Sequence, residues 1–329
     1  MSISRRTWVP LLTISLALAS SLVTVSSHAQ TYPARAIKLM VPLGAGSTAD
    51  ILSRIIGAEL AKAVGQPVVI ENKASAGGTV AMAELARSAA DGYTISFASQ
   101  GNLVFNQTIY AKPGYDSLKD FEPIVFVGGV SNIMVVPPGS PARTVADFIA
   151  MAKANPGTTF SSGGNGTSHH LSGVLFGQLT GTDLLHVPYK GAAQGILAVM
   201  SGEVAVGFFN TPTVISQIKG DKLLGLAVTS LTTSPLLPNL PTLDSSGVKG
   251  YEVNTWFGFV APAKTPPQIV GKLHSEITKI LAKPEIREQL AAQGFQLAPV
   301  KTPAEFGAII RADFDKWPDI IKKSGATVN

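Results

Sequence analysis

Short apolar runs alternate with segments of helical periodicity in the region that follows residue 36. Ile37–Leu43 has the composition of a buried strand, and Ala49–Val64 places apolar residues three and four positions apart, as one face of a helix requires. Further strands are expected at 68–71 and 93–98, with a helix at 78–90 between them. This βαβαβ order predicts a mostly parallel sheet with helices on both faces.

A second unit of the same kind is predicted further along the chain. Thr144 and Asp147 have the spacing of a capping box, and the helix that they open is expected to end before Pro156. Strands are then expected at 159–161, 184–188, 204–209 and 223–229, and helices at 168–180 and 194–201. The C-terminal part predicts helices at 266–282, 284–293 and 302–317. The last of these is opened by a capping box of Thr302 and Glu305.

Two extended stretches, 121–136 and 243–260, lack helical periodicity and are rich in Gly, Pro and β-forming residues. We interpret them as crossovers, near 121–137 and 225–260, that carry the chain from one lobe to another and back. Lobe 1 is predicted to comprise 30–125 with 232–329, and lobe 2 to comprise 126–231. The predicted fold class is α/β, with two doubly wound lobes and a central cleft, an arrangement that suits hinge closure on a ligand.

The N-terminal segment has the features of an export signal. Arg5 and Arg6 precede an apolar run from Trp8 to Val25, and Ser27–Ala29 approximates the small-x-small pattern of a cleavage site. We therefore expect residues 1–29 to be a cleaved signal peptide and the mature protein to be periplasmic. A membrane anchor is the alternative, because the run approaches the roughly 18–20 residues that span a bilayer. The arginine pair leaves both the general and the twin-arginine export routes open.

The amino-acid composition excludes several kinds of functional site. The 329-residue chain has no cysteine, which excludes disulfides, thiolate metal sites, cysteine nucleophiles and a lipid-modified N-terminal cysteine. Residues 1–29 hold two of the 26 basic residues and none of the 21 acidic ones, so the remainder has a formal charge of +3. Its basic residues do not form a stripe interleaved with aromatic residues, and nucleic-acid binding is not expected.

Open parallel sheets bind ligands beyond the carboxyl ends of their strands, where loops lead into helices. The loop at 42–50 is the first candidate, because its glycines allow close backbone approach and the helix start presents unpaired N–H groups to a carboxylate or phosphate. An ordinary tight turn with a helix cap is the alternative. Asp50 is expected to cap the helix or pin the loop, since an acid aimed at an anion would repel it. The candidate ligand-binding residues of this loop are Leu43, Gly44, Ala45, Gly46, Ser47, Thr48 and Asp50.

The loop at 161–170 is the second candidate and is dense in small hydrogen-bond donors. His170 is expected to bond to a loop or to the ligand, and His169 to be exposed. Neighbours on a helix point about 100° apart, so the two histidines are not expected to share a metal ion. No metal or cofactor is predicted. The candidate residues of this loop are Ser162, Gly163, Asn165, Thr167, Ser168 and His170.

Three further strand ends supply the remaining candidates. Lys190 is a cation placed near the expected cleft, although a solvated lysine is the equal alternative. Asn102 and Asn210 have amides that orient polar ligand groups, and Phe209 offers a flat apolar wall. The candidate residues from these strand ends are Ser99, Asn102, Tyr189, Lys190, Gly191, Phe209 and Asn210.

Catalysis finds little support in these loops. Ser47, Ser162 and Ser168 do not lie in a G-x-S-x-G elbow, and the loops contain no paired carboxylates. Donors without a nucleophile–base pair favour a binding protein over an enzyme, so no catalytic residue is predicted. The alternatives are a hydrolase on the same fold and a sensory receptor that presents its ligand-bound form to a membrane signalling partner.

The loops together resemble the motifs of the Bug family, the TctC-like extracytoplasmic receptors of tripartite tricarboxylate transporters. The matching segments are Val41–Asp50, Gly166–Leu171, His186–Ala192, Leu226–Ser230 and Leu237–Thr242. The resemblance implies a type 2 periplasmic-binding fold, a membrane permease as partner and an organic carboxylate as ligand. It further implies that backbone amides, hydroxyls and bound waters hold the carboxylate between both lobes. A monomer is expected, because binding proteins that deliver to a permease are commonly monomers.

The resemblance carries over to the loop at 43–50 and to Thr167, Ser168 and His170, with departures. Gly46-Ser47 replaces the usual double glycine, and Gly44-Ala45 replaces the usual prolines. Where the family commonly has Phe-Asp-Asn, this chain has Phe208-Phe209-Asn210, so a ligand ammonium loses an acidic partner. We therefore expect an aromatic, longer aliphatic or dicarboxylic acid rather than an amino acid.

Overall fold

In the computed structural model, which describes residues 32–74, 76–323 and 326, the described strands join into one ten-stranded sheet. The strands are β1 (Ile37–Val41), β2 (Val68–Asn72), β3 (Thr94–Ser99), β4 (Phe121–Val136), β5 (Thr158–Ser162), β6 (Leu184–Pro188), β7 (Val206–Asn210), β8 (Leu224–Val228), β9 (Asn254–Pro262) and β10 (Gln296–Leu297). Their order is β2-β1-β3-β9-β4-β7-β5-β6, and β8 and β10 each pair with β4. The predicted signal peptide lies outside the described residues.

Two groups of parallel strands form the ends of this sheet. β1 pairs in parallel with β2 and β3, and β5 pairs in parallel with β6 and β7. Parallel neighbours need crossover connections, which here are α1 (Thr48–Val64), α2 (Thr79–Ala86), α5 (Ser168–Thr180) and α6 (Ala192–Met200). The two βαβαβ units predicted from the sequence are thus confirmed, with most bounds within two residues of the expected ones.

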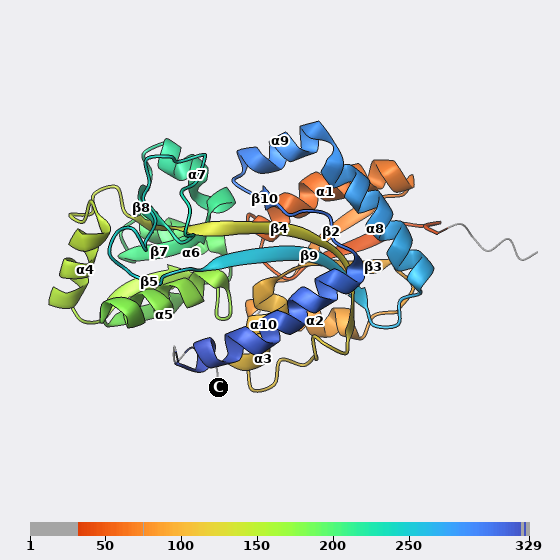
Figure 1. Ribbon diagram of the computed structural model, residues 1–329, viewed down its shortest axis with the longest axis horizontal. Helices are drawn as coiled ribbons and strands as arrows, with labels where there is room; N and C mark the ends of the chain where they lie inside the picture. The colour runs from red at the N-terminus through yellow and green to blue at the C-terminus, as the bar shows by residue number, and fades with distance from the viewer. Residues whose placement is uncertain (1–31, 75, 324–325, 327–329) are drawn as a thin grey trace, which may run out of the picture. The chain divides into compact units, whose positions relative to one another are not determined.

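Two long strands connect the groups and run side by side through the centre of the sheet (Figure 1). β4 pairs with β9 over Phe121–Ser131 and with β7 over Asn132–Val135, and β9 pairs on its other edge with β3. These pairings are all antiparallel, and β4 leads the chain towards the second group while β9 leads it back. The mostly parallel arrangement expected from the sequence therefore holds only within each group. The α/β fold class is confirmed, while the lobe boundaries remain a prediction.

Helices cover both faces of the sheet (Figure 1). Besides the crossover helices, they are η1 (Ala76–Gly78), η2 (Gly101–Phe105), α3 (Asn106–Ile109), α4 (Val145–Ala154), α7 (Thr211–Lys219), α8 (Pro267–Ala282), α9 (Pro284–Ala292) and α10 (Pro303–Lys323). Both predicted capping boxes form. In the one before α10, the Thr302 N–H donates to Glu305 Oε2 at 2.8 Å and the Glu305 N–H donates to Thr302 Oγ1 at 3.2 Å. The other caps α4, through Thr144 and Asp147.

The sequence prediction was wrong at several elements. α7 was not expected from the sequence; its Pro212 lies in the first helical turn, where proline is tolerated. The helical turns η2 and α3 were also missed. α10 continues through Pro318 to Lys323, beyond its expected end at Trp317. Of the second extended stretch, only β9 is a strand.

Both faces of the sheet are covered by helices, and the core around the first group of strands is rich in aromatic side chains. Phe97 of β3 stacks on Phe257 of β9 with ring centroids 5.7 Å apart, and both side chains are almost fully buried. Leu52, Ile56 and Leu60 of α1 pack onto the same cluster. Burying each such side chain contributes about 1.5–3 kcal/mol. This packing holds β1, β3 and β9 together beneath α1.

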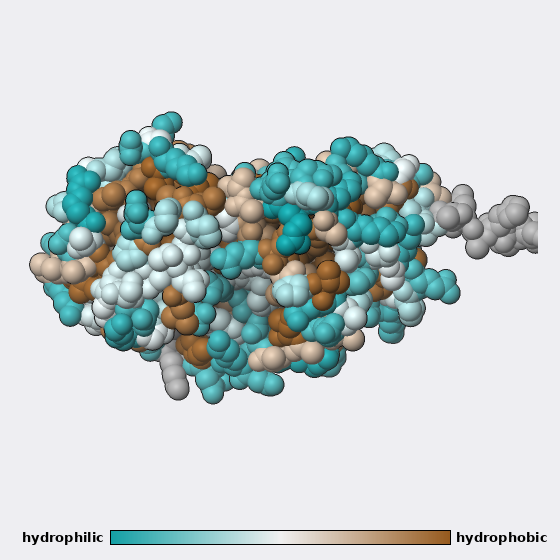
Figure 2. Space-filling model, turned by 45° about the horizontal axis from the view of Figure 1, so that its top comes forward, coloured by the Kyte–Doolittle hydropathy of each residue, from teal (hydrophilic) through white to brown (hydrophobic). Residues whose placement is uncertain are grey.

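The surface carries apolar side chains as separate patches among hydrophilic ones on the face that Figure 2 shows. In the described part of the chain, none of the helices has the length and apolar character needed to cross a membrane. The apolar run at 8–25 lies outside the described residues.

Candidate functional site

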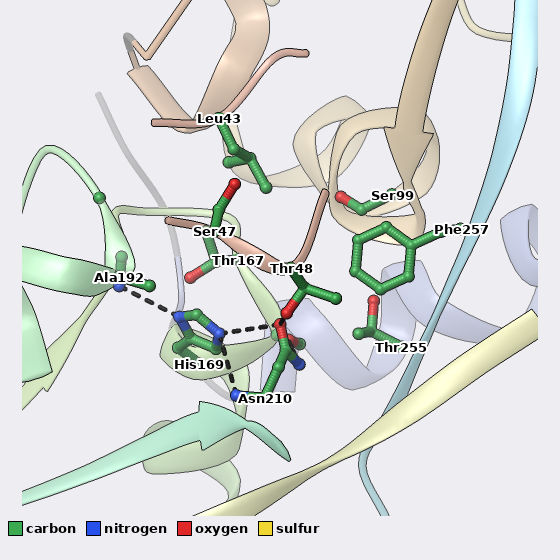
Figure 3. Close-up of a pocket in the computed structure, with 13 residues that line it drawn as sticks. Leu43, Ser47, Thr48, Ser99, Thr167, His169, Ala192, Asn210, Thr255 and Phe257 are labelled. Carbon is green, nitrogen blue, oxygen red and sulfur yellow. Dashed lines mark hydrogen bonds between the residues drawn. The ribbon is translucent and has the colours of Figure 1, made fainter. Parts of the chain in front are cut away.

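The loops at the carboxyl ends of β1, β3, β5, β6 and β7 meet around one cavity, which we call the inner chamber (Figure 3). β9 adds two residues to its wall. The chamber has a volume of about 20 Å³. It is lined by Leu43, Ser47, Thr48, Ser99, Gly163, Thr167, Ser168, His169, Gly191, Ala192, Asn210, Thr255 and Phe257. The residues come from both groups of strands, so the chamber lies between them.

Helix starts surround the inner chamber. Ser47 and Thr167 are the N-cap residues of α1 and α5, and their hydroxyls accept the N–H groups of Asp50 and His170 at 3.3 Å. α6 and α7 begin after Gly191 and Asn210 without a side-chain cap. The first N–H groups of a helix have no partner within the helix and carry a partial positive charge. Four such helix starts face a chamber whose lining contains no Asp, Glu, Lys or Arg.

His169 lies in the chamber wall as a neutral imidazole. The Gly163 N–H donates to its Nδ1 at 3.2 Å, and its Nε2 lies 3.1 Å from Asn210 Oδ1. The Asn210 N–H also approaches Nε2, at 3.4 Å, so Asn210 contacts this nitrogen through both its side chain and its backbone. Burial lowers the pKa of His169 to about 4, although the hydrogen bond to Asn210 acts in the opposite direction. The histidine thus orders the wall without adding charge.

Asn210 connects both sides of the chamber. Its Oδ1 accepts the Thr48 hydroxyl at 3.2 Å, which links α1 to the end of β7. Its Nδ2 donates to Asn132 Oδ1 and, at 3.4 Å, to Ser168 Oγ. Asn132 in turn donates to Ser172 Oγ at 2.8 Å. Every polar atom of the Asn210 side chain is therefore engaged by neutral partners, which holds the amide in one orientation.

A second cavity adjoins the first, and we call it the outer chamber. Leu43 and Gly163 line both cavities, and the outer one has a volume of about 200 Å³. It is lined by Pro42, Leu43, Ala74, Gly77, Gly78, Tyr110, Gly163, Gly164, Asn165, Pro188, Tyr189 and Lys190. Among these lining residues, Lys190 is the one with a formal charge.

Beside these chambers, the backbone of η2 is in close contact with the backbone of the 163–167 loop. A Cβ atom added at Gly101 would lie 2.6 Å from the Gly166 carbonyl oxygen, so the helical turn η2 touches the 163–167 loop directly. The Tyr110 hydroxyl donates to the Asn165 carbonyl at 3.4 Å. Glycine at position 101 is thus required for this approach rather than for a turn, since its φ is not positive.

Several predicted site residues support the loops and line neither chamber. Asp50 accepts the Gly46 N–H at 2.9 Å and pairs with Arg54, which agrees with the predicted pinning role. Asn102 accepts the Ser99 N–H at 3.0 Å and donates to the Gly77 carbonyl at 2.8 Å, so its amide is occupied by backbone. The predicted residues outside both linings are Gly44, Ala45, Gly46, Asp50, Asn102, Ser162, His170 and Phe209.

Three histidines lie close together around the β5–α5 loop. His170 stacks on His186 with ring centroids 4.0 Å apart, and His186 Nε2 lies 2.7 Å from Ser162 Oγ. The Gly166 N–H donates to His170 Nδ1 at 3.4 Å, which is the loop contact expected for this residue. Burial lowers the pKa of His170 to about 4 and that of His186 to about 3, the latter also through the charge of His170. Within the described residues, no group of three His, Asp or Glu side chains is arranged to hold a metal ion.

The expectation for His169 was wrong, and that for Phe209 is not met. His169 is 6% exposed rather than solvated, because the first turn of α5 enters the protein between the loops. Phe209 is fully buried and meets His169 edge-on, with ring centroids 5.0 Å apart. Both faces of β7 are covered by helices, so Phe209 packs into the core and only the last residue, Asn210, reaches the chamber.

Sequence reasoning missed four residues of the inner wall: His169, Ala192, Thr255 and Phe257. In Figure 3, Phe257 lies on the opposite side of the chamber from His169, with Thr255 and Ser99 near its ring. The signal for His169 was the absence of any charged residue between Phe160 and Thr182, since a helix start without charges is readily buried. Nothing local marked Thr255 or Phe257, because β9 reaches this place through long-range pairing.

Comparisons with known proteins agree on one family. The sequence profile of the tripartite tricarboxylate transporter family receptor, TctC, matches residues 52–326. Protein BugT of Bordetella pertussis (strain Tohama I) is 31% identical over 315 residues, which cover 95% of this chain and 96% of BugT. These matches confirm the resemblance inferred from the loop motifs.

Solved structures give the same answer for the fold. An R. palustris protein solved with adipate superimposes with a TM-score of 0.87 at 32% identity, covering 90% of this chain and all (100%) of that one. MatC from Rhodopseudomonas palustris, solved with bound malate, gives a TM-score of 0.84 at 25% identity, covering 88% of this chain and 100% of MatC. Together with the matching family profile and the similarity to BugT, these structures show that the chain belongs to the TctC family of tripartite tricarboxylate transporter receptors.

Proposed function

We propose that this protein is a periplasmic receptor that holds the carboxylate of a small organic acid in the inner chamber and delivers it to a membrane permease. The observation that carries the proposal is the convergence of four helix starts on a chamber whose lining has no formally charged side chain. Backbone N–H groups at helix starts bind anions without a formal cation. The R. palustris protein solved with adipate and MatC solved with malate support a carboxylate as the ligand class.

Neutral donors suit a receptor that must also release its ligand. A carboxylate held by several N–H and O–H groups is stabilised by each of them, and none contributes the strong attraction of a buried ion pair. The hydroxyls of Ser47 and Ser168 line the chamber beside the helix starts, while that of Thr48 already donates to Asn210 Oδ1. When the two groups of strands move apart, these donors bond to water again, so releasing the ligand costs little free energy.

The export signal and the permease partner complete the proposal. The family is one of transporter receptors, and residues 1–29 have the pattern of a cleaved signal peptide. We infer that the mature protein begins at Gln30 and acts as a monomer. N-terminal sequencing of the secreted protein tests the cleavage site, and size-exclusion chromatography with light scattering tests the monomer.

The ligand class is tested by titration calorimetry on protein that has been unfolded, dialysed and refolded to remove any bound acid. Each acid is compared with its neutral amide of the same shape, for example succinate with succinamide. We expect acids to bind and amides to bind at least about a hundredfold more weakly, because only the acids gain the helix-start interaction. Equal binding of acid and amide would contradict the proposal. Uptake of the bound acid by a strain lacking the gene, with and without a plasmid copy, tests delivery to a permease.

A further inference from the structure

The antiparallel pairing of β3 with β9 ends at the inner chamber. Its last pair is Ser99 and Phe257, and both residues line the chamber (Figure 3). After this pair the chain leaves β3 at Gln100 and enters η2, so the strand pairing itself does not hold η2 to β9. The position of η2 matters because Gly101 lies against the Gly166 carbonyl of the 163–167 loop.

A carboxylate on α10 connects η2 to β9 at this point. Asp313 Oδ2 accepts a hydrogen bond from Gln100 Nε2 at 2.7 Å and another from Trp256 Nε1 at 2.7 Å. Gln100 is the first residue after the strand pairing, and Trp256 precedes Phe257 in β9. α10 itself packs against β4 and η2, which holds the carboxylate in place. One oxygen atom of Asp313 therefore joins the two elements where their strand pairing stops.

Both donors are buried and depend on Asp313 for a partner. Gln100 is 4% exposed and Trp256 is 9% exposed. Among the described residues, Asp313 is the one acceptor for each of these two side-chain N–H groups. A charged acceptor forms shorter and stronger hydrogen bonds than a neutral one, and a buried donor without a partner destabilises the protein. These two bonds therefore favour one position of η2 relative to β9.

We propose that Asp313 is a positioning residue for the inner chamber, which holds η2 to β9 so that Gly101 can meet Gly166. The inference rests on the proposed carboxylate-binding function and adds to it a residue that lines neither chamber. Without the two bonds, η2 is free to shift, and the contact that closes the chamber forms less readily. Ligand affinity then depends on α10, although this helix contributes no residue to either lining.

Two substitutions of Asp313 test the proposal. Asp313→Leu keeps the branched side chain and removes the acceptor, whereas Asp313→Asn keeps one oxygen that can accept both N–H groups. Calorimetry with succinate and adipate on refolded protein should show affinity about tenfold weaker in Asp313→Leu, the equivalent of one or two lost hydrogen bonds. Asp313→Asn should stay within about threefold of the wild type, since its bonds are weaker but keep their geometry. Asp315→Leu, at an exposed position of the same helix, should bind like the wild type.

A second control separates positioning from a general loss of stability. Asp313→Leu leaves two buried donors without an acceptor and should also lower the free energy of unfolding in urea. Val145→Ala removes buried methyl groups on α4, which contributes no residue to either chamber, and should lower stability as well. Val145→Ala should nevertheless bind both acids like the wild type. An equal loss of affinity in the two variants would assign the effect to stability and overturn the proposal.

A double variant tests whether Asp313 acts through η2. Gly101→Ala disturbs the contact with Gly166 directly, so once this contact is lost, removal of the Asp313 carboxylate should cost little more affinity. The protein with both Asp313→Leu and Gly101→Ala should therefore bind about as weakly as either single variant. Independent effects would instead multiply to a loss of about a hundredfold.

The outcomes distinguish this inference from the proposed function. Unchanged affinity in Asp313→Leu, or a hundredfold loss in the double variant, overturns the positioning role while carboxylate binding stands. Failure of every acid tried, succinate and adipate included, to bind the correctly folded wild-type protein overturns the proposed function and, with it, this inference.

Discussion

The Thr48 hydroxyl donates a hydrogen bond to Asn210 Oδ1 at 3.2 Å, between residues 162 positions apart in the chain. Thr48 begins α1 next to the first group of parallel strands, and Asn210 ends β7 in the second group. Both side chains are at least 95% buried. The bond therefore closes the inner chamber from two sides, and it exists only when the two sides are in contact.

Replacing Thr48 with valine tests this bond, because valine has nearly the same shape and no hydroxyl. Loss of one neutral hydrogen bond costs about 0.5–1.5 kcal/mol, so we expect affinity for the acid to fall about two- to tenfold in calorimetry. Thr278→Val on α8, which lines neither chamber, is the matched control and should bind like the wild type. Unchanged affinity in Thr48→Val would show that the bond does not contribute to the ligand-bound state.

Replacing Gly101 tests how closely η2 and the 163–167 loop must approach each other for the acid to bind. Alanine at this position would place its Cβ atom 2.6 Å from the Gly166 carbonyl oxygen, so the 163–167 loop would have to move away. We expect affinity for the acid to fall about tenfold, the equivalent of one or two lost hydrogen bonds. Unfolding in urea should show a much smaller change, since each side can still fold.

Gly271 provides the control for a glycine-to-alanine change in a helix. It lies in α8, and no atom within 4 Å would meet an added Cβ. Gly271→Ala should keep full affinity and raise the free energy of unfolding by about 0.5–1 kcal/mol, because alanine is the better helix former. Equal affinity of the two alanine variants would show that the contact at Gly101 is not needed for binding.

The parts of the site that local chemistry encodes could be predicted from the sequence. The bounds of α5 agree at both ends because Thr167 provides an N-cap and Gly181 adopts the left-handed conformation that ends the helix. The loop after β1 was recognisable because its glycines and hydroxyls precede a helix of regular apolar spacing. Ser47, Thr48 and Ser168, which these signals indicated, all line the inner chamber.

The remaining parts depend on long-range packing. Phe257 reaches the chamber because β9 pairs with β3 across 158 positions between Ser99 and Phe257, and no residue near either strand encodes this pairing. Phe209 and Asn210 are neighbours, yet one lies in the core and the other in the chamber wall. Which of them faces the ligand is decided by where β7 ends relative to β4, and that register depends on the whole sheet.

Asn210→Asp tests the neutrality of the inner chamber. The new carboxylate would occupy the field of the helix starts, repel a ligand acid and face Asn132 Oδ1 without a donor of its own. We expect affinity for acids to fall more than about a hundredfold. His169 should gain a pKa well above its value of about 4, because the carboxylate would lie beside its Nε2.

Calorimetry and NMR titration of the His169 ring measure both effects. Asn239→Asp makes the same change of charge at an exposed loop position and should leave both affinity and the His169 titration unchanged. Retention of full affinity in Asn210→Asp would show that the ligand anion does not lie near this residue.

The buried histidines predict how stability depends on pH. The pKa values of His169 and His170 are lowered to about 4 and that of His186 to about 3, below the value of 6.5 for an exposed imidazole. The unfolded chain therefore binds more protons than the folded one between about pH 6.5 and 4, and the free energy of unfolding falls as the pH falls through this range. Stability is complete above about pH 6.5. At about pH 5, the loss is on the order of 1–2 kcal/mol for each histidine.

Urea unfolding at about pH 7.5 and pH 5 measures this loss, and the window lies above the range in which most carboxylates titrate. His186→Gln keeps a group that can bond to Ser162 Oγ but removes one titrating ring. The variant should be less stable than the wild type at the higher pH, because it loses the stack on His170, and should lose less on acidification. A free energy of unfolding that is flat between the two pH values would mean that these imidazoles are protonated in the folded protein, and the neutral wall assigned to His169 would no longer stand.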